Sequence, residues 1–444
     1  MLTTDRRVVH RIAKTSYGAI RVASIRRSNK MHGLSRIAFG FMWLFVFTIA
    51  WENVIVVPGV GTVGKLVGIV TFAVGILAIV NTGHMRRFAA IHGVMALFVM
   101  WGGFTLLWSK APDRTREEVI TYIQLLLMVW ILRELASNSW AQRSLISAFV
   151  LGTYVSAIFT FTAAISGTSA HYQRYSAEGF NPGDLALIIV LSVPFSIYLA
   201  SVEKNTFWLW IYRIQPAVAA CAVLCTAARG ALIDLGIACL IIPLSFRRWN
   251  IGQQLTVFFV GVVGIIGIAL FVPASSWSRL GTIETEVTSG TLNERTIIWK
   301  AGLDVFRENP INGIGVNAFA PTIQRALGTP RQIKNAAANN VVELVAHNTF
   351  ISVLVEEGVV GFLLFIFILA GLWKGIFGLP VAERKLWFVV LLVWTVGVME
   401  LTWEYRKPTW LLFGLLAAVT TTVQIQKRTA QPNGHNRSSM HQLN

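Results

Sequence analysis

Charged side chains are scarce in this sequence, and acidic ones especially so. Only 13% of the 444 residues are Asp, Glu, Lys or Arg, whereas hydrophobic residues make up 55%. A soluble globular domain carries roughly 25% charged residues, so the composition excludes an ordinary soluble domain. Most of the chain must face lipid or other apolar helices, and its length can supply about a dozen spans of about 20 residues each.

Cysteine is also rare, and the few cysteines have apolar neighbours. The three are Cys221, Cys225 and Cys239, and each stands in an apolar run of the sequence. Cysteines in such runs are typical of small core residues, so we expect neither a disulfide framework nor a cysteine metal site.

Motifs for a metal or a nucleotide are missing from the sequence. No Asp-x-Asp pair occurs, Glu284-x-Glu286 is the only near match, and the histidines are scattered. There is also no Gly-rich phosphate loop of the kind that binds nucleotides. We therefore expect no metal site and no cofactor, which agrees with chemistry outside the cytosol, where ATP and sugar nucleotides are absent.

Long apolar runs dominate what is present, and they predict an all-α polytopic membrane protein. We place twelve transmembrane helices at 36–51, 66–80, 88–108, 118–132, 145–165, 184–201, 207–227, 231–246, 255–273, 349–372, 386–402 and 408–425. The first 30 residues are basic and contain no apolar core. They therefore argue against a cleavable signal peptide and for an N-terminus that starts in the cytosol.

The basic residues predict how the spans are oriented. The connections that would share one side with both chain ends carry 22 Lys and Arg against four acidic residues, whereas the other side carries 15 basic and 17 acidic residues. Loops rich in Lys and Arg stay in the cytosol, so we expect a multi-pass protein of a bacterial inner membrane with cytosolic N- and C-termini. Contact with anionic membrane lipids accounts for the net charge of +17, and nucleic acid is not an expected partner.

One connection is much longer than the others and divides the chain. Residues 274–348 would form a large periplasmic loop between the ninth and tenth spans. The expected organisation is a basic cytosolic segment at 1–35, spans one to nine within 36–273, the loop at 274–348, spans ten to twelve within 349–425 and a cytosolic tail at 426–444.

The long loop carries helical signals of its own and is predicted to be a partly helical cap on the membrane. A capping box at 291–294 opens an amphipathic helix that ends before Pro310. A second short helix is expected at about 316–327, and a third is expected to begin near Val341 and continue into the tenth span.

Three polar residues near the predicted outer edge of the membrane are candidates for chemistry. Arg229 stands in a tight turn between two apolar helices, where an arginine either snorkels to water or holds an anion. Arg295, on the first turn of the cap helix, is either solvated or adds its charge to the positive end of that helix. His347 lies where the cap meets the tenth span; a lone interfacial histidine is often structural, but a neutral one accepts a proton at working pH. The candidate partners of Arg229 and His347 are Asp234 and Glu343, respectively.

Two motifs around these residues resemble a known family. They are Asn309-Pro310-Ile311-Asn312-Gly313-Ile314-Gly315-Val316-Asn317-Ala318-Phe319, and Ala346-His347-Asn348-Thr349-Phe350-Ile351 followed by Glu356-Glu357-Gly358-Val359-Val360-Gly361. Together with Arg295 and Trp299, they are similar to the shared region of the bacterial O-antigen ligase and polymerase superfamily. The resemblance is specific over 225–365 and weaker elsewhere.

The resemblance implies glycan transfer from undecaprenyl diphosphate at a periplasmic site, without metal or ATP. In the ligase branch, the acceptor is a sugar hydroxyl of the lipid A–core and the product is lipopolysaccharide. The family's two arginines map onto Arg229 and Arg295, which would hold the diphosphate. Its loop histidine maps onto His347, the expected base. Further candidates for substrate contacts are Arg174, Arg279 and Asn348.

The resemblance leaves other functions open. A glycan polymerase or a protein O-glycosyltransferase of the same superfamily would use the same donor and the same histidine with a different acceptor. A twelve-span transporter is the remaining alternative, but transporters place ionisable residues near the middle of the bilayer. Arg213 and Glu400 are the only plausible deep charges here, and the polar residues concentrate at the outer edge. The ligase interpretation is therefore favoured, with the size of the loop as a further argument.

Overall fold

The structure is a computed structural model of the 444-residue chain. It describes residues 33–59, 61–83, 85–86, 88–168, 174–239, 295–327 and 344–430. Several sequence-based expectations lie outside the described residues: the ninth span at 255–273, the capping box at 291–294, Arg279 and Glu343.

Helices account for nearly all of the regular structure in these ranges. They are α2 (Gly33–Ile49), α3 (Val63–Thr82), α4 (Ala90–Phe104), α5 (Pro112–Leu135), α6 (Ser139–Ser166), α7 (Pro182–Val202), α8 (Thr206–Thr226), α9 (Arg229–Cys239), α14 (Arg295–Glu308), α15 (Phe319–Ala326), α16 (Thr349–Phe377), α17 (Val381–Gly397) and α18 (Lys407–Ala430). The short 3-10 helix η1 (Thr105–Leu107) continues α4, and the strands β1 (Val56–Val57) and β2 (Gly61–Thr62) pair antiparallel between α2 and α3. Every predicted span except the ninth overlaps one of these helices, so the all-helical prediction is confirmed for the described residues.

The helix ends follow from local sequence. Asn138, Asn181 and Asn205 precede α6, α7 and α8, and each side chain accepts a hydrogen bond from a backbone N–H of the first turn. Asparagine is favoured at this position because its side-chain oxygen satisfies a donor that has no partner within the helix. Gly83 and Gly167 end α3 and α6 in the left-handed conformation, with φ of 65° and 70°.

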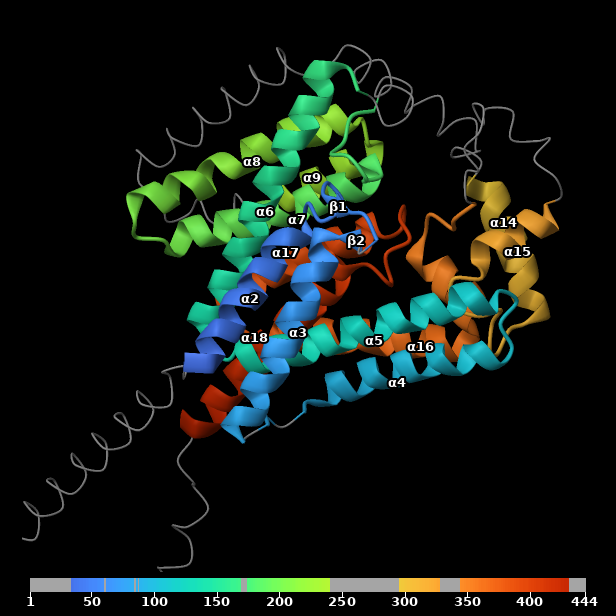
Figure 1. Cartoon of the computed structure of the whole chain (residues 1–444), viewed down its shortest axis with the longest axis horizontal. Coiled ribbons are helices and arrows are strands. Elements are labelled where there is room, and N and C mark those ends of the chain that lie inside the picture. The colour runs from blue at the N-terminus through green and yellow to red at the C-terminus, as the bar shows by residue number, and fades with distance from the viewer. Residues whose placement is uncertain are drawn as a thin grey trace, which may run out of the picture.

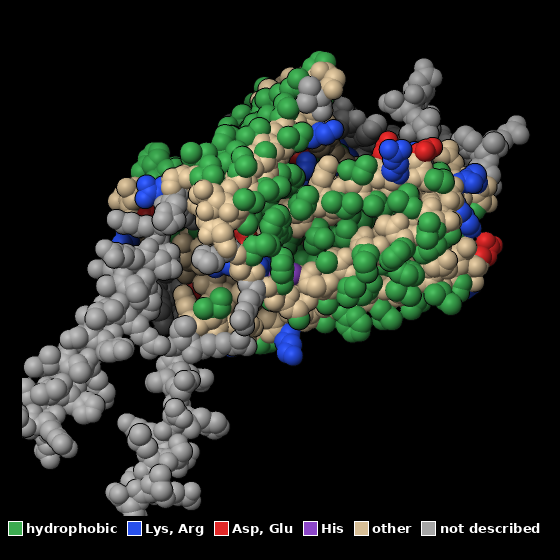
Figure 2. Space-filling view, turned by 60° about the horizontal axis from the view of Figure 1, so that its bottom comes forward, with side chains coloured by type: hydrophobic (Ala, Val, Ile, Leu, Met, Phe, Trp, Pro, Cys, Tyr) green, Lys and Arg blue, Asp and Glu red, His purple; other side chains and the backbone are tan. Residues whose placement is uncertain are grey.

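Seven of the described helices are long and apolar enough to cross a membrane. They are α3, α4 together with η1, α6, α7, α8, α16 and α18. One face of the molecule is covered largely by hydrophobic side chains, with few charged ones among them (Figure 2). Lipid is the solvent that such a surface requires, so this part of the chain has the character of a multi-pass membrane protein. The count of twelve spans stays a prediction.

The core of the bundle lies around α7. In the apolar stretch of α7, 83% of the residues are buried, whereas in that of α3 only 33% are. α7 therefore lies inside the bundle and α3 at its periphery. α7 contacts α6, α8, α9 and α17. Phe195 on α7 meets Trp387 on α17 edge to face, with ring centroids 5.5 Å apart, and both side chains are buried. Such aromatic pairs add to the free energy gained from burial alone.

A second, smaller core joins the two cap helices to the rest of the molecule. α14 and α15 pack against each other and against α16, at one end of the α4, α5 and α16 group (Figure 1). The buried side chains of this second core are Ile298, Val305, Ile314, Ala318, Phe319, Ile323, Ala346 and Val355. Of the residues on the predicted apolar side of α14, Ile298, Ala301, Val305 and Phe306 face this core, whereas Ile297 and Leu303 are exposed.

The loops that the charge pattern assigns to the outer side contact one another. Asn53 Nδ2, between α2 and α3, donates to Gly179 O, between α6 and α7, at 3.2 Å. Trp403 Nε1, between α17 and α18, donates to Asp184 Oδ1 at the start of α7, at 2.9 Å. Loops far apart in the sequence thus meet at one end of the bundle, which is the arrangement that alternating spans would give.

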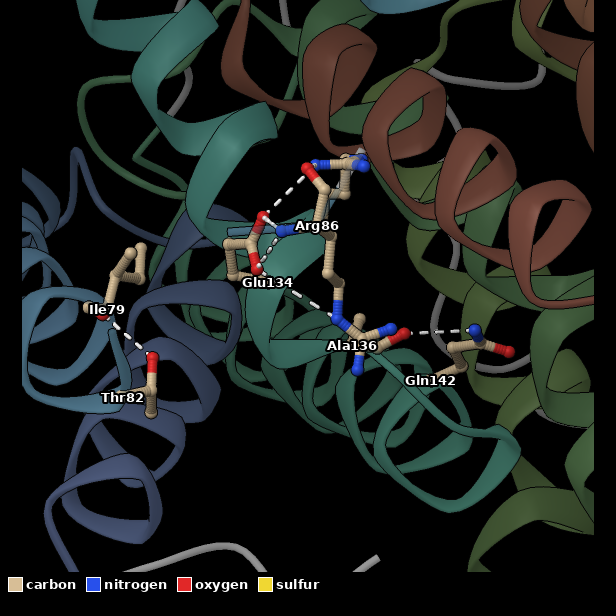
Figure 3. Close-up of polar contacts among 7 residues, drawn as sticks. Ile79, Thr82, Arg86, Glu134, Ala136 and Gln142 are labelled. Carbon is tan, nitrogen blue, oxygen red and sulfur yellow. Dashed lines mark hydrogen bonds and ion pairs between the residues drawn. The ribbon is translucent and has the colours of Figure 1, made fainter. Parts of the chain in front are cut away.

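The connections assigned to the inner side meet at the other end. The backbone N–H of Arg86, before α4, donates to Glu134 Oε1 at the end of α5, at 3.2 Å, and Gln142 Nε2 on α6 donates to Ala136 O at 3.0 Å (Figure 3). Gln142 Nε2 also donates to Thr422 Oγ1 on α18, at 3.0 Å. These bonds join the start of α4 to the end of α5, and the start of α6 to the last helix.

Candidate active site

His347 stands in an irregular segment, 344–348, between the cap and α16. The predicted helix that continues from Val341 into the tenth span is wrong for these residues, because α16 begins at Thr349. The backbone of His347 has φ of +47°, which is uncommon for a residue other than glycine. Such a conformation persists only where the surroundings fix it, and it is frequent at functional sites.

Two neighbouring elements hold the backbone on either side of His347. Trp299 Nε1 on α14 donates to Ala346 O at 2.7 Å. On the other side, the backbone N–H of Thr349 donates to Val398 O at 2.9 Å. His347 is therefore fixed between the cap helix α14 and the loop that follows α17.

The amide of Asn348 has structural partners at both ends. Its Oδ1 accepts a hydrogen bond from Ile351 N at 3.0 Å and caps α16, and its Nδ2 donates to Met399 O at 3.1 Å. The side chain thus ties the start of α16 to the loop after α17. Its role in substrate binding stays a prediction.

Arg295 is the first residue of α14, one helical turn before Trp299. Residues four apart share one face of a helix, so the bond from Trp299 to Ala346 also places Arg295 on the side of His347. Arg295 Nη1 lies 3.9 Å from Glu400 Oε2, and the two side chains are 25% and 43% exposed. The distance is long for an ion pair and both side chains are partly solvated, so the pair contributes little free energy.

The charge around His347 is positive. Burial, and after it the nearby guanidiniums of Arg295 and Arg174, together lower the pKa of His347 from the ordinary 6.5 to about 4. The imidazole is therefore neutral at neutral pH, with a lone pair that can accept a proton.

Arg174 belongs to the connection between α6 and α7, which the charge pattern assigns to the outer side. Its Nε donates to Thr226 O, the last residue of α8, at 3.1 Å, and the neighbouring Tyr175 N donates to Cys225 O at 3.2 Å. A cation at a helix C-terminus is stabilised by the unpaired carbonyl groups there. Arg174 is therefore anchored beside the turn that leads into α9.

Arg229 begins α9 immediately after that turn, in which Ala227 adopts φ of +48°. A Cβ atom added at Gly230 would overlap the carboxylate of Glu400, so this carboxylate lies directly against the backbone next to Arg229. Glu400 thus contacts both the segment that carries Arg229 and the side chain of Arg295. Asp234 is buried one turn further along α9, and its Oδ1 has no hydrogen-bond partner within the described residues.

Glu400 itself was assigned to the wrong environment by hydropathy. The eleventh span is predicted at 386–402, which would put Glu400 within the bilayer. α17 ends at Gly397, and Glu400 lies in the loop beyond it. A lone acidic residue near the outer end of an apolar run is the sequence signal that could have identified it.

The arrangement combines positive charge with a neutral base. His347, Arg295 and Arg174 come together, and Glu400 connects them to the start of α9. Such a set can bind an anion and remove a proton from a neighbouring hydroxyl. Among the residues described, no three His, Cys, Asp or Glu side chains form a group that could hold a metal ion.

The two sequence motifs of the cap interlock through their backbones. Residues 310–315 lie against a break in α16 at Gly358, whose φ of 68° and ψ of −170° are open to glycine alone. The N–H of Ile314 donates to Val355 O at 3.1 Å, and that of Val359 donates to Pro310 O at 2.9 Å. A Cβ at Gly358 would overlap a carbonyl oxygen of the facing motif. The motifs therefore form one structural unit beneath the site.

Glu356 completes this unit by capping α15. Its carboxylate accepts hydrogen bonds from Asn317 N at 2.8 Å and from Phe319 N at 3.0 Å. Phe319 is the first residue of α15, where N–H groups have no partner within the helix, and Asn317 lies two residues before it. The acidic residue of the second motif thus positions the cap helix that follows the first motif.

A family model described as O-antigen ligase matches residues 217–366. Residues 217–366 are therefore similar to the O-antigen ligase family. No curated protein matches the chain. The matched region contains Arg229, Arg295, His347 and both interlocking motifs, and the resemblance seen in the sequence is thereby confirmed. Arg174 and Glu400 lie outside it, on the elements that pack around it.

Proposed function

We propose that this protein transfers O-antigen glycan from undecaprenyl diphosphate to a sugar hydroxyl of lipid A–core, which completes lipopolysaccharide. The family match implies a glycan-transferring enzyme. The observation that carries the proposal is the position of His347, a neutral base near the guanidiniums of Arg295 and Arg174, in a segment that α14 holds through the hydrogen bond from Trp299 Nε1 to Ala346 O.

The donor provides its own leaving group in this reaction. Arg229 and Arg295 would bind the lipid diphosphate and stabilise the negative charge that develops as the glycosidic bond breaks. His347 would take the proton of the acceptor hydroxyl while its oxygen forms the new bond to the anomeric carbon. The electron pair of the broken bond leaves with the diphosphate. A single displacement of this kind inverts the anomeric centre.

Transfer by the purified full-length protein tests the proposal. The assay contains lipid-linked glycan, lipid A–core and a metal chelator, and no nucleotide. We expect transfer by the wild type and a loss of at least about a hundredfold for His347→Ala, since general-base catalysis contributes about that much or more. Transfer at the wild-type rate by His347→Ala would remove the histidine from the mechanism.

A matched pair of substitutions on α14 tests the arginine assignment. Arg295→Ala should lose transfer with normal membrane insertion. Arg307, on the last turn of the same helix, is 76% exposed and serves as the control. Arg307→Ala should retain transfer. Equal loss in both variants would mean that α14 contributes through its packing rather than through the charge of Arg295.

The same assay separates the ligase from the polymerase. A ligase places the glycan on lipid A–core, whereas a polymerase extends the glycan that is still attached to undecaprenyl diphosphate. A protein O-glycosyltransferase would need a protein acceptor. Product on lipid A–core alone is the expected result.

A further inference from the structure

The backbone around Glu400 is held by hydrogen bonds, whereas its side chain is partly exposed to water. Val398 O accepts a hydrogen bond from Thr349 N at 2.9 Å, and Leu401 O accepts one from Thr349 Oγ1 at 2.9 Å. Asn348 Nδ2 binds the carbonyl of Met399 in the same stretch. The Glu400 side chain is 43% exposed. It can therefore change rotamer into water without moving the loop.

The Glu400 carboxylate lies between the two segments that carry the proposed diphosphate ligands. On one side it touches the Gly230 backbone, next to Arg229, at the start of α9. On the other side its Oε2 is 3.9 Å from Arg295 Nη1. A carboxylate and a phosphate are both oxygen anions, and guanidinium groups bind either of them.

The pair with Arg295 is too loose to be a structural bridge. Its separation is at the outer limit of an ion pair, and both side chains are partly in water. A partly exposed pair of this kind contributes little free energy, so a ligand with more negative charge can displace the carboxylate. A lipid diphosphate carries more charge than one carboxylate.

We propose that Glu400 is the resident counter-ion of the donor site. Its carboxylate occupies the place of a phosphate between Gly230 and Arg295 until a lipid diphosphate displaces it. The proposal rests on the proposed function in that it uses the same donor site. It also makes Glu400 a determinant of specificity. A diphosphate carries more negative charge than a monophosphate, and both carry more than a carboxylate, so a diphosphate displaces Glu400 more readily than a monophosphate does.

Binding to the detergent-solubilised full-length protein tests the proposal without an acceptor. The probes are farnesyl diphosphate and farnesyl monophosphate, and the variant is Glu400→Gln, which keeps the size of the side chain and removes its charge. We expect Glu400→Gln to bind both probes about two- to fivefold more tightly, as loss of a competing exposed ion pair implies. The relative gain in affinity should be larger for farnesyl monophosphate. The ratio of the affinities for the diphosphate and the monophosphate should therefore be smaller in Glu400→Gln than in the wild type.

Glu178 provides the matched control. It lies exposed in the outer connection before α7, and Glu178→Gln removes one negative charge from the same end of the molecule. This variant should bind both probes like the wild type. Equal tightening in both variants would overturn the proposal, because the effect would then come from net charge alone.

Transfer kinetics provide a second readout. The gain from Glu400→Gln should appear in KM for the lipid-linked donor rather than in kcat. Unchanged or weaker probe binding would overturn the counter-ion role, as would a fall in kcat at constant KM, which indicates that Glu400 acts through His347. If Glu400→Gln tightens diphosphate binding but the wild type does not glycosylate lipid A–core, the counter-ion role stands and the acceptor assignment fails.

Discussion

At His347, burial and two guanidiniums act in the same direction on one imidazole. They lower its pKa from 6.5 to about 4, so the free protein keeps a neutral base well below the pH at which an ordinary histidine becomes charged. A diphosphate that binds to Arg295 would offset part of this positive charge. The pKa of His347 should therefore rise when the donor is bound, and the base should become stronger in the complex that needs it.

This difference predicts two distinct acid limbs in the pH dependence of transfer. The profile of kcat/KM reports the free enzyme and kcat reports the complex. We expect activity to fall with decreasing pH at a higher pH in kcat than in kcat/KM. Rates measured between pH 4 and 8, at limiting and at saturating donor, check this order. Coincident limbs, or the reverse order, would contradict the coupling between donor and base.

Substitution of Arg174 should shift the acid limb of the pH profile of kcat/KM. Arg174→Gln removes one of the charges that lower the pKa of His347, so that pKa should rise towards its ordinary value. The acid limb of kcat/KM should therefore move to higher pH. Arg143 lies on α6 at the opposite end of the bundle, and Arg143→Gln should leave the limb in place. A limb that moves equally in both variants would argue against a local effect of Arg174.

The sequence identified the chemistry of these residues better than their surroundings. Arg295 and His347 were found because motifs and a helix start mark them. The sequence predicted Glu400 within a span because hydropathy is averaged over many residues. Such an average does not reveal that α17 ends at Gly397. The hydrogen bonds from Asn348 and Thr349 to carbonyls within 398–401 decide that environment, and such long-range bonds leave no local pattern in the sequence.

At the scale of elements, the break in α16 determines how the cap meets the membrane helices. Gly358 has backbone angles that other residues avoid, and its Cα faces the carbonyl of Ile311 without room for a Cβ. The sequence showed the two motifs but predicted neither the break nor their contact. It also extended the third cap helix through 344–348, since helical propensity does not reveal that His347 has to adopt a positive φ.

Gly358→Ala should therefore destabilise the protein. The strained backbone alone costs about 1–3 kcal/mol, and the overlap with the backbone carbonyl adds to it. Gly40 on α2 has a helical conformation and open space around its Cα, so Gly40→Ala is the control and should be neutral or slightly stabilising. Thermal unfolding in detergent measures both. Equal midpoints for the two variants would mean that α16 can close its break without losing the interlock with residues 310–315.

At the scale of the whole molecule, two independent observations agree about its ends. The charge pattern sorts the connections into a basic set and a mixed set. The structure brings members of the mixed set together around Asn53, Gly179 and Asp184, and members of the basic set together around Arg86 and Gln142. Charge counting supplies the direction in the membrane and the packing of the helices supplies the grouping, so neither alone gives the full topology.

The connections on either side of α7 provide the test of that direction. Glu178 precedes this helix and Lys204 follows it, and both side chains are exposed. With Cys221, Cys225 and Cys239 replaced by serine or alanine, Glu178→Cys should react with a membrane-impermeant maleimide in intact spheroplasts. Lys204→Cys should react only after the membrane is opened, because basic loops remain in the cytosol. The variant without cysteines controls for background labelling. Labelling of Lys204→Cys in intact spheroplasts, with Glu178→Cys protected, would show that the protein has the opposite orientation in the membrane. His347 would then lie on the cytosolic side.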